Sequence, residues 1–281
     1  MKKIAISLDS ASDLSKELIE KYDFKIIPFG VTMGDRFFYD GEVDPEEIFE
    51  YADKNKTLPK TNAVNEEAFR EHFETLLKDY DAIIHFDISS DMSSAYQNAV
   101  NAAKNFKNVY VIDSRTLSTG ISLEAIYAKK LTETNDNPEE IVELVKKRIP
   151  NVQASFIIER LDYLYKGGRC SGLALLGANL LRIRPEIEVI DGNMKNTDKF
   201  RGKMTDCVTK YCRATLEKYC HPDKSVIFIT HSVAEPEMVE AAKAVVAEYG
   251  FENVYEPTAG CTVSSHCGKN TLGILYINDA E

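Results

Sequence analysis

The sequence predicts an α/β protein of two domains: a mostly parallel sheet with helices on both faces, then a mixed sheet with helices. Three observations support this fold class. Strand-like and helix-like segments alternate along the first half, as they do in parallel sheets. The second half contains a hairpin-like segment, which requires antiparallel strands. The length of 281 residues suits two domains, which we expect at 1–150 and 151–281.

The first half alternates apolar, β-branched runs with segments of helical periodicity. Its last helix shows a clear start signal, because Asn137 stands at the N-cap position and Pro138 follows it. We expect strands at 3–8, 25–31, 82–88 and 108–112, and helices at 15–22, 44–54, 93–106, 117–131 and 137–149.

The second half begins with an apolar strand and continues through a hairpin whose turn is "DGN", residues 191–193. Gly250 is placed where a helix would end on a left-handed glycine. We expect strands at 152–158, 186–190, 225–230 and 271–277, and helices at 204–219 and 236–249.

Charge and composition exclude several classes of protein. The chain carries 34 Lys and Arg against 45 Asp and Glu, a formal net charge of −11, which disfavours a nucleic-acid partner. No signal-peptide core and no apolar run of membrane-spanning length is visible, so we expect no integral membrane segment and a cytoplasmic protein. The six cysteines should be small buried hydrophobes. The group Cys261, His266 and Cys267 has an unusual spacing for zinc, so we expect no metal and no cofactor.

A serine-rich segment, "SSDMSSAYQNA" at 89–99, lies between a predicted strand and a predicted helix. Backbone N–H groups at such a junction, together with serine hydroxyls, favour a bound anion. Helix capping is the simpler alternative, and it explains one serine better than four. Thr61 is expected in a loop before another helix, and His266 in a glycine-containing loop before the last strand. A carboxylate could bind to Ser93, Thr61 and His266 without a buried lysine or arginine.

The segment Leu173–Leu181 is apolar on all sides of a helix. Such a helix is either part of the core or the wall of an apolar cavity. An anion site beside an apolar cavity is what a receptor for a long-chain carboxylic acid needs, because the cavity takes the tail and a few polar groups fix the head.

Seven segments, in the same order along almost the whole chain, resemble the DegV family. The N-terminal one is "DSASDL" at 9–14, and the serine-rich segment at 89–99 is another. The remaining five are "PKTNAV", "VIDSRTLSTG", "LDYLYKGGRCS", "KFRGK" and "HCGKNTLG".

The resemblance implies two α/β domains with a ligand tunnel between them. It also implies a fatty-acid-binding subunit of bacterial fatty acid kinase rather than an autonomous enzyme. By motif position the carboxylate-binding residues would be Thr61, Ser93 and His266. The partners would be a long-chain fatty acid and an ATP-dependent kinase, docked through Arg169 and Arg201.

The chain departs from the family pattern in four places. Asn62-Ala63-Val64 replaces Ser-Gln-Pro, Met92 replaces leucine, and Lys269-Asn270 replaces Pro-Gly beside His266. Ser94 replaces a glycine and offers one more hydroxyl at the head-group position.

Two alternative functions remain open on the sequence. Ser93 and His266 could form the nucleophile and base of a hydrolase or transferase. However, the nearest segment to a Gly-x-Ser-x-Gly motif, "GISLE" at 120–124, lacks its last glycine. The other alternative is a binder of a different apolar carboxylic acid.

Overall fold

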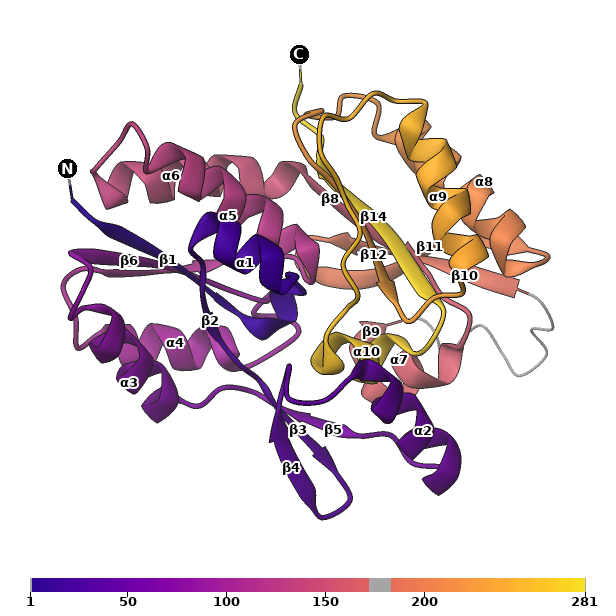
Figure 1. The fold of residues 1–281 in the computed structure, drawn as a ribbon, viewed down its shortest axis with the longest axis horizontal. Coiled ribbons are helices and arrows are strands. Elements are labelled where there is room, and N and C mark those ends of the chain that lie inside the picture. Colours follow the sequence, from indigo (N-terminus) through magenta and orange to yellow (C-terminus); the bar gives the residue numbers. More distant parts are fainter. Residues whose placement is uncertain (1, 172–182, 281) are drawn as a thin grey trace.

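The computed structural model describes residues 2–171 and 183–280 and shows two sheets side by side (Figure 1). The apolar segment Leu173–Leu181 lies outside the described residues. The first sheet has four parallel strands in the order β2-β1-β6-β7. Helices cover both of its faces, which explains why every residue of the two central strands is buried. Its strands are β1 (Ile4–Asp9), β2 (Lys25–Ile27), β6 (Ala82–Asp87) and β7 (Val109–Asp113).

Four helices cover the two faces of the first sheet. α3 (Glu66–Leu76) and α4 (Ala95–Ala103) pack on one face, and α5 (Thr119–Leu131) and α6 (Pro138–Arg148) on the other (Figure 1). The expected side-chain cap forms at α6, where Asn137 accepts from the N–H groups of its first turn. At α1 (Lys16–Tyr22), Ser15 accepts from the Leu18 N–H.

A small antiparallel sheet was not predicted from the sequence. It contains β3 (Gly30–Met33), β4 (Arg36–Tyr39) and β5 (Lys60–Asn62), and α2 (Pro45–Asn55) lies within the same stretch of chain. The single strand expected at 25–31 is therefore wrong. Pro28 has no N–H for a strand ladder, and the chain passes from the parallel sheet into the small sheet at that point.

The second large sheet is mixed and has seven strands in the order β13-β12-β14-β8-β10-β11-β9. The expected hairpin is present, since β10 and β11 pair antiparallel across Asp191 and Gly192. The strands are β8 (Val152–Ile157), β9 (Cys170–Ser171), β10 (Ile183–Ile190), β11 (Asn193–Arg201), β12 (Ile227–Ser232), β13 (Val254–Tyr255) and β14 (Thr271–Ile277).

Helices α8 (Met204–Lys218) and α9 (Pro236–Ala247) pack on one face of the second sheet. α9 ends two residues before the predicted position, because the N–H groups of Glu248 and Tyr249 bond to carbonyls three residues back rather than four. Gly250 then adopts the left-handed conformation (φ +70°). The short helices are η1 (Ser10–Ser12), η2 (Ile149–Asn151), α7 (Leu161–Gly167) and α10 (Cys261–Cys267).

Helix α5 connects the two large sheets. It contacts β1 and β6 of the first sheet and β8 and β14 of the second, and nine of its thirteen residues are buried. One hydrophobic core therefore runs from the first sheet into the second. The domain division expected after residue 150 falls within η2 and stays a prediction.

Two further findings concern the described ranges, 2–171 and 183–280. No helix there is long and apolar enough to cross a bilayer, and no group of three His, Cys, Asp or Glu residues could hold a metal ion. Five of the six cysteines are buried as expected, but Cys220 is exposed.

Candidate functional site

A cavity of about 250 Å³ contains the site residues predicted from the sequence. Its polar groups include Thr61, Ser93 and Ser94 from the first half of the chain and His266 from the second half. Its apolar lining consists of Phe29, Ala63, Ile88, Met92, Leu117, Met194, Val263 and Cys267. A larger cavity of about 400 Å³ lies elsewhere, but its walls carry polar groups such as Gln153 and Glu188. The smaller one has the lining that an apolar chain with a polar head requires.

Thr61 and His266 are brought together from positions 205 residues apart. The Thr61 Oγ1 atom lies 2.8 Å from His266 Nε2, which is a hydrogen-bond distance. Both residues lie in different elements from those expected: Thr61 is in strand β5 rather than a loop, and His266 is in helix α10 rather than a loop. Thr61 is paired with Val31 of β3, and this register fixes its position.

Helix α10 was not predicted because its N-terminal cap comes from a distant residue. The residue at its N-cap position is Gly260, which has no side chain to offer. Instead, the Asp40 carboxylate accepts from the backbone N–H groups of Cys261 at 2.7 Å and Thr262 at 3.1 Å. Helix α10 contacts both α2 and α7, and the three helices lie close together in Figure 1. Only the folded chain supplies this cap.

The His266 imidazole is neutral at pH 7. Burial and the nearby positive charge of Arg169 lower its pKa to about 4. A neutral imidazole that donates its Nε2–H to Thr61 leaves the Thr61 hydroxyl proton free for a ligand. A carboxylate only accepts hydrogen bonds, so this arrangement suits it. The other ring nitrogen, Nδ1, is buried and has no hydrogen-bond partner among the described residues.

Gly167 explains how the imidazole is positioned. A Cβ atom at this residue would lie 2.6 Å from His266 Nδ1, so only glycine leaves room for the ring. Gly167 is the last residue of α7, and Gly168 ends that helix in the left-handed conformation.

The four serines of the predicted segment divide into two pairs. Ser93 and Ser94 line the cavity. The Ser93 hydroxyl accepts the Ala95 N–H at 3.1 Å, while Ser94, at the N-cap of α4, makes no side-chain cap bond within the described part of the chain. The capping explanation therefore applies to Ser93, and its hydroxyl proton remains free to donate.

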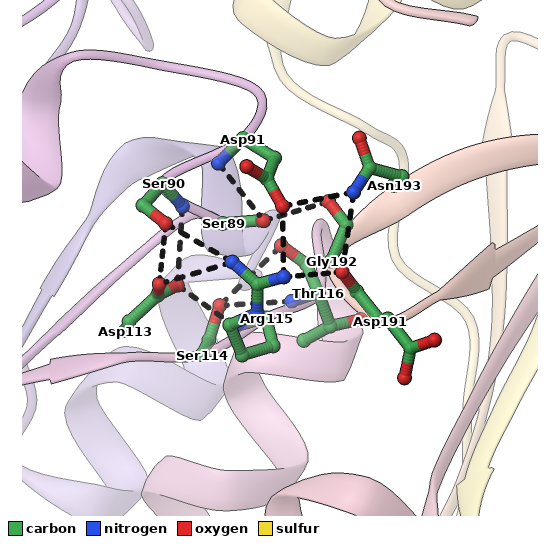
Figure 2. A network of polar contacts seen from close by, with 10 residues as sticks. All are labelled: Ser89, Ser90, Asp91, Asp113, Ser114, Arg115, Thr116, Asp191, Gly192 and Asn193. Carbon is green, nitrogen blue, oxygen red and sulfur yellow. Dashed lines mark hydrogen bonds and ion pairs between the residues drawn. The ribbon is translucent and has the colours of Figure 1, made fainter. Parts of the chain in front are cut away.

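Ser89 and Ser90 belong to a polar network that joins the two domains (Figure 2). The Ser89 hydroxyl donates to the Gly192 carbonyl in the β10–β11 turn at 2.7 Å. Arg115 donates to Asp91 at 2.7 Å and to the Asp191 carbonyl of the same turn. This network holds the hairpin against the serine segment.

The two predicted docking arginines lie apart. Arg169 lines the cavity itself. Arg201 is the last residue of β11, seven residues beyond the cavity-lining Met194, which is about 23 Å along an extended strand. The structure thus groups Arg169 with Thr61 and His266 but not with Arg201.

A family model described as "Uncharacterised protein, DegV family" matches residues 3–279. The chain belongs to the DegV family. A DegV domain-containing protein of Caldanaerobacter subterraneus is 30% identical over 98% of this chain and 99% of its own length. A Thermotoga maritima relative, named fatty acid-binding protein, is 29% identical over 96% of each chain.

A solved structure has the same fold. A DegV family protein from Thermus thermophilus, described by its fatty acid binding, has a TM-score of 0.91 at 23% identity, covering 99% of this chain and 100% of that one. This likeness confirms the predicted fold class, with two α/β domains.

Sequence reasoning missed the acidic residues that assemble this DegV site. Besides Asp40, Asp13 contributes: its carboxylate accepts from the Gly260 N–H at 2.8 Å and from the Ser118 hydroxyl at 2.5 Å. Burial raises the Asp13 pKa well above its usual value. Asp13 lies in the segment "DSASDL", but nothing local in the sequence indicates a partner 247 residues away.

Proposed function

We propose that this protein binds one long-chain fatty acid, with the acyl chain in the apolar cavity and the carboxylate on Thr61, Ser93 and His266. The observation that carries the proposal is the Thr61–His266 hydrogen bond in the wall of an otherwise mainly apolar cavity. The relatives described as fatty-acid-binding proteins support the same ligand class.

The energetics favour a long chain over a short one. Burial of each CH₂ group contributes about 0.8 kcal/mol, so the tail provides most of the affinity. The head group provides orientation: the Thr61 and Ser93 hydroxyls each have a proton to donate, and Ser94 adds a third hydroxyl at the cavity wall.

We further propose that the bound acid is the substrate of a separate ATP-dependent kinase. A carboxylate oxygen attacks the γ-phosphorus of ATP, a new O–P bond forms, and the bond from that phosphorus to the β–γ bridging oxygen breaks, releasing ADP. The acyl phosphate stays bound, with its acyl chain enclosed in the cavity, and feeds phospholipid synthesis. The protein is then a cytoplasmic carrier with no catalysis of its own, and Arg169 and Arg201 contact the kinase.

The hydrolase alternative has weaker support. His266 Nε2 is bonded to Thr61, and the structure records no hydrogen bond between Ser93 and His266, both of which it describes. No carboxylate within the described ranges bonds His266 Nδ1, so the ring lacks the orienting partner of a catalytic triad.

Native mass spectrometry of the purified protein, with solvent extraction of the ligand, tests the proposal. We expect one co-purifying acid of about 14–18 carbons, because an apolar cavity retains such a ligand. The double variant Ser93→Ala/His266→Ala should lose palmitate affinity and acyl-phosphate formation with the kinase. The matched control Ser15→Ala/His221→Ala changes the same residue types away from the cavity. A ligand-free protein that takes up neither palmitate nor oleate would refute the proposal, and ester hydrolysis without a partner would support the hydrolase.

A further inference from the structure

An open groove of about 500 Å³ adjoins the head-group site and carries four cationic side chains, Lys56, Lys60, Lys166 and Arg169. No Asp or Glu is among the residues that line it. We call this surface the basic groove. Its other lining residues are Thr57, Leu58, Pro59, Thr61, Gly167, Ser265 and His266. In a chain of net charge −11, such a concentration of cations requires an explanation.

The lysine charges are not neutralised by neighbouring acids. Lys56, Lys60 and Lys166 form no ion pair with any described residue. Acids on the adjoining helices are already occupied, because Asp53 of α2 and Asp162 of α7 both pair with Arg160.

Helix dipoles offset only part of this charge. Lys56 is the C-cap of α2 and Lys166 lies in the last turn of α7, where each helix end contributes roughly −0.5 charge. Four cations against two such helix ends leave a net charge of about +3. A position at a helix end explains two of these cations, Lys56 and Lys166, but not all four around one groove.

The basic groove opens directly onto the proposed carboxylate site. Thr61, Arg169 and His266 line both the groove and the apolar cavity. A group attached to the carboxylate of a bound acid would therefore project into the groove.

We propose that the basic groove binds a phosphate dianion, and specifically the phosphate of an acyl phosphate whose chain occupies the cavity. This inference rests on the proposed function. A phosphate monoester carries about −1.5 to −2 charges at pH 7 and accepts hydrogen bonds on three oxygens, which suits several lysine point charges. The groove then holds the product after transfer, whereas the carboxylate form does not reach the lysines.

The test compares two ligands with the same chain. One is palmitate, and the other is the β-ketophosphonate in which a CH₂ group replaces the bridging oxygen of palmitoyl phosphate. Calorimetric titration of the wild type should show the phosphonate binding at least tenfold more tightly. The variant Lys60→Ala/Lys166→Ala should lose that preference and keep its palmitate affinity within threefold.

Two control variants distinguish the effect of the groove lysines from the effect of the protein's net charge. Lys78→Ala/Lys107→Ala removes two exposed lysines from the turns that precede β6 and β7 and should keep the preference. Lys60→Arg/Lys166→Arg preserves the charge in the groove and should also keep most of the preference for the phosphonate.

A second titration, with inorganic phosphate alone, distinguishes lipid-borne from free phosphate. Lysine-dependent binding of inorganic phosphate, with no preference for the phosphonate over palmitate, would overturn the acyl-phosphate assignment in favour of a free phosphate. If palmitate binds and neither phosphate probe responds to the lysines, the groove proposal is wrong and the fatty-acid proposal stands. If palmitate itself does not bind, both are wrong.

Discussion

The adjacent glycines 167 and 168 allow a sharp test of how the head-group site is positioned. The Gly167→Ala substitution places a methyl group 2.6 Å from His266 Nδ1, whereas ordinary contact begins at 3.4 Å. The imidazole must therefore move by about 0.8 Å, away from Gly167. Its Nε2 atom is held at 2.8 Å from Thr61 Oγ1, so this shift distorts the hydrogen bond that orients the Thr61 hydroxyl.

We expect Gly167→Ala to weaken palmitate binding by about tenfold to one-hundredfold. Hydrogen bonds to a charged group contribute about 1.5–3 kcal/mol, and a misplaced hydroxyl forfeits most of one such bond. Isothermal titration with palmitate measures the affinity, and urea denaturation measures the free energy of unfolding. Alanine suits a helix better than glycine, so the gain in helix propensity opposes the crowding and the stability should change little.

Gly168→Ala is the matched control. Nothing lies within 4 Å of a Cβ atom at this position, but its φ of +68° strains any residue other than glycine. This variant should lose about 1 kcal/mol of stability and retain its palmitate affinity. Equal affinity losses in the two variants, or none in Gly167→Ala, would refute the role we give to the Gly167–His266 contact.

Three other predictions concern the hydroxyl, the cap and the charge of this site. Thr61→Val leaves His266 Nε2 unpaired and should weaken palmitate binding about tenfold, whereas Thr61→Ser should keep nearly the wild-type affinity. Equal palmitate affinities of the two variants would contradict the role we give to the Thr61 hydroxyl. Asp40→Ala removes the cap of α10 and should cost about 1–2 kcal/mol in urea denaturation. Asp44→Ala is its control, since Asp44 makes no side-chain cap bond within the described residues. Because the His266 pKa is about 4 in the folded chain and 6.5 when unperturbed, the unfolded state binds more protons between these values and stability falls as the pH falls. This residue should account for a loss of about 2 kcal/mol between pH 7 and pH 5 that is absent in His266→Gln; equal pH slopes would show that the imidazole is not buried neutral.

The sequence predicted the regular elements of both large sheets because their signals are local. The buried strand at residues 4–9 and the last strand at 271–277 are mainly apolar runs, and Asn137 directly precedes the helix that it caps. The small sheet was not predicted, because its three strands have only three or four residues each and depend on pairing with one another for their conformation.

The site shows the same division between local and distant causes. Ser93 was predicted because serines at a strand–helix junction form a local pattern. The helix that carries His266 was missed because its cap, Asp40, is more than 200 residues away. Arg115 was missed for a similar reason. One of its partners is the carbonyl of Asp191, 76 residues away, and no short sequence motif predicts a contact over that separation.

These long-range contacts also assemble the Thr61–His266 pair. Asp13 and Asp40 hold the start of α10, and α10 holds His266 against Thr61. Under the proposed function, a bound carboxylate accepts from the Thr61 hydroxyl, whose orientation depends on this arrangement. Any ligand that binds only this assembled state stabilises it by about 2.7 kcal/mol at one hundred times its dissociation constant. Asp13 and Asp40 do not line the cavity, yet they hold the helix that carries His266, so their removal should disturb the Thr61–His266 pair.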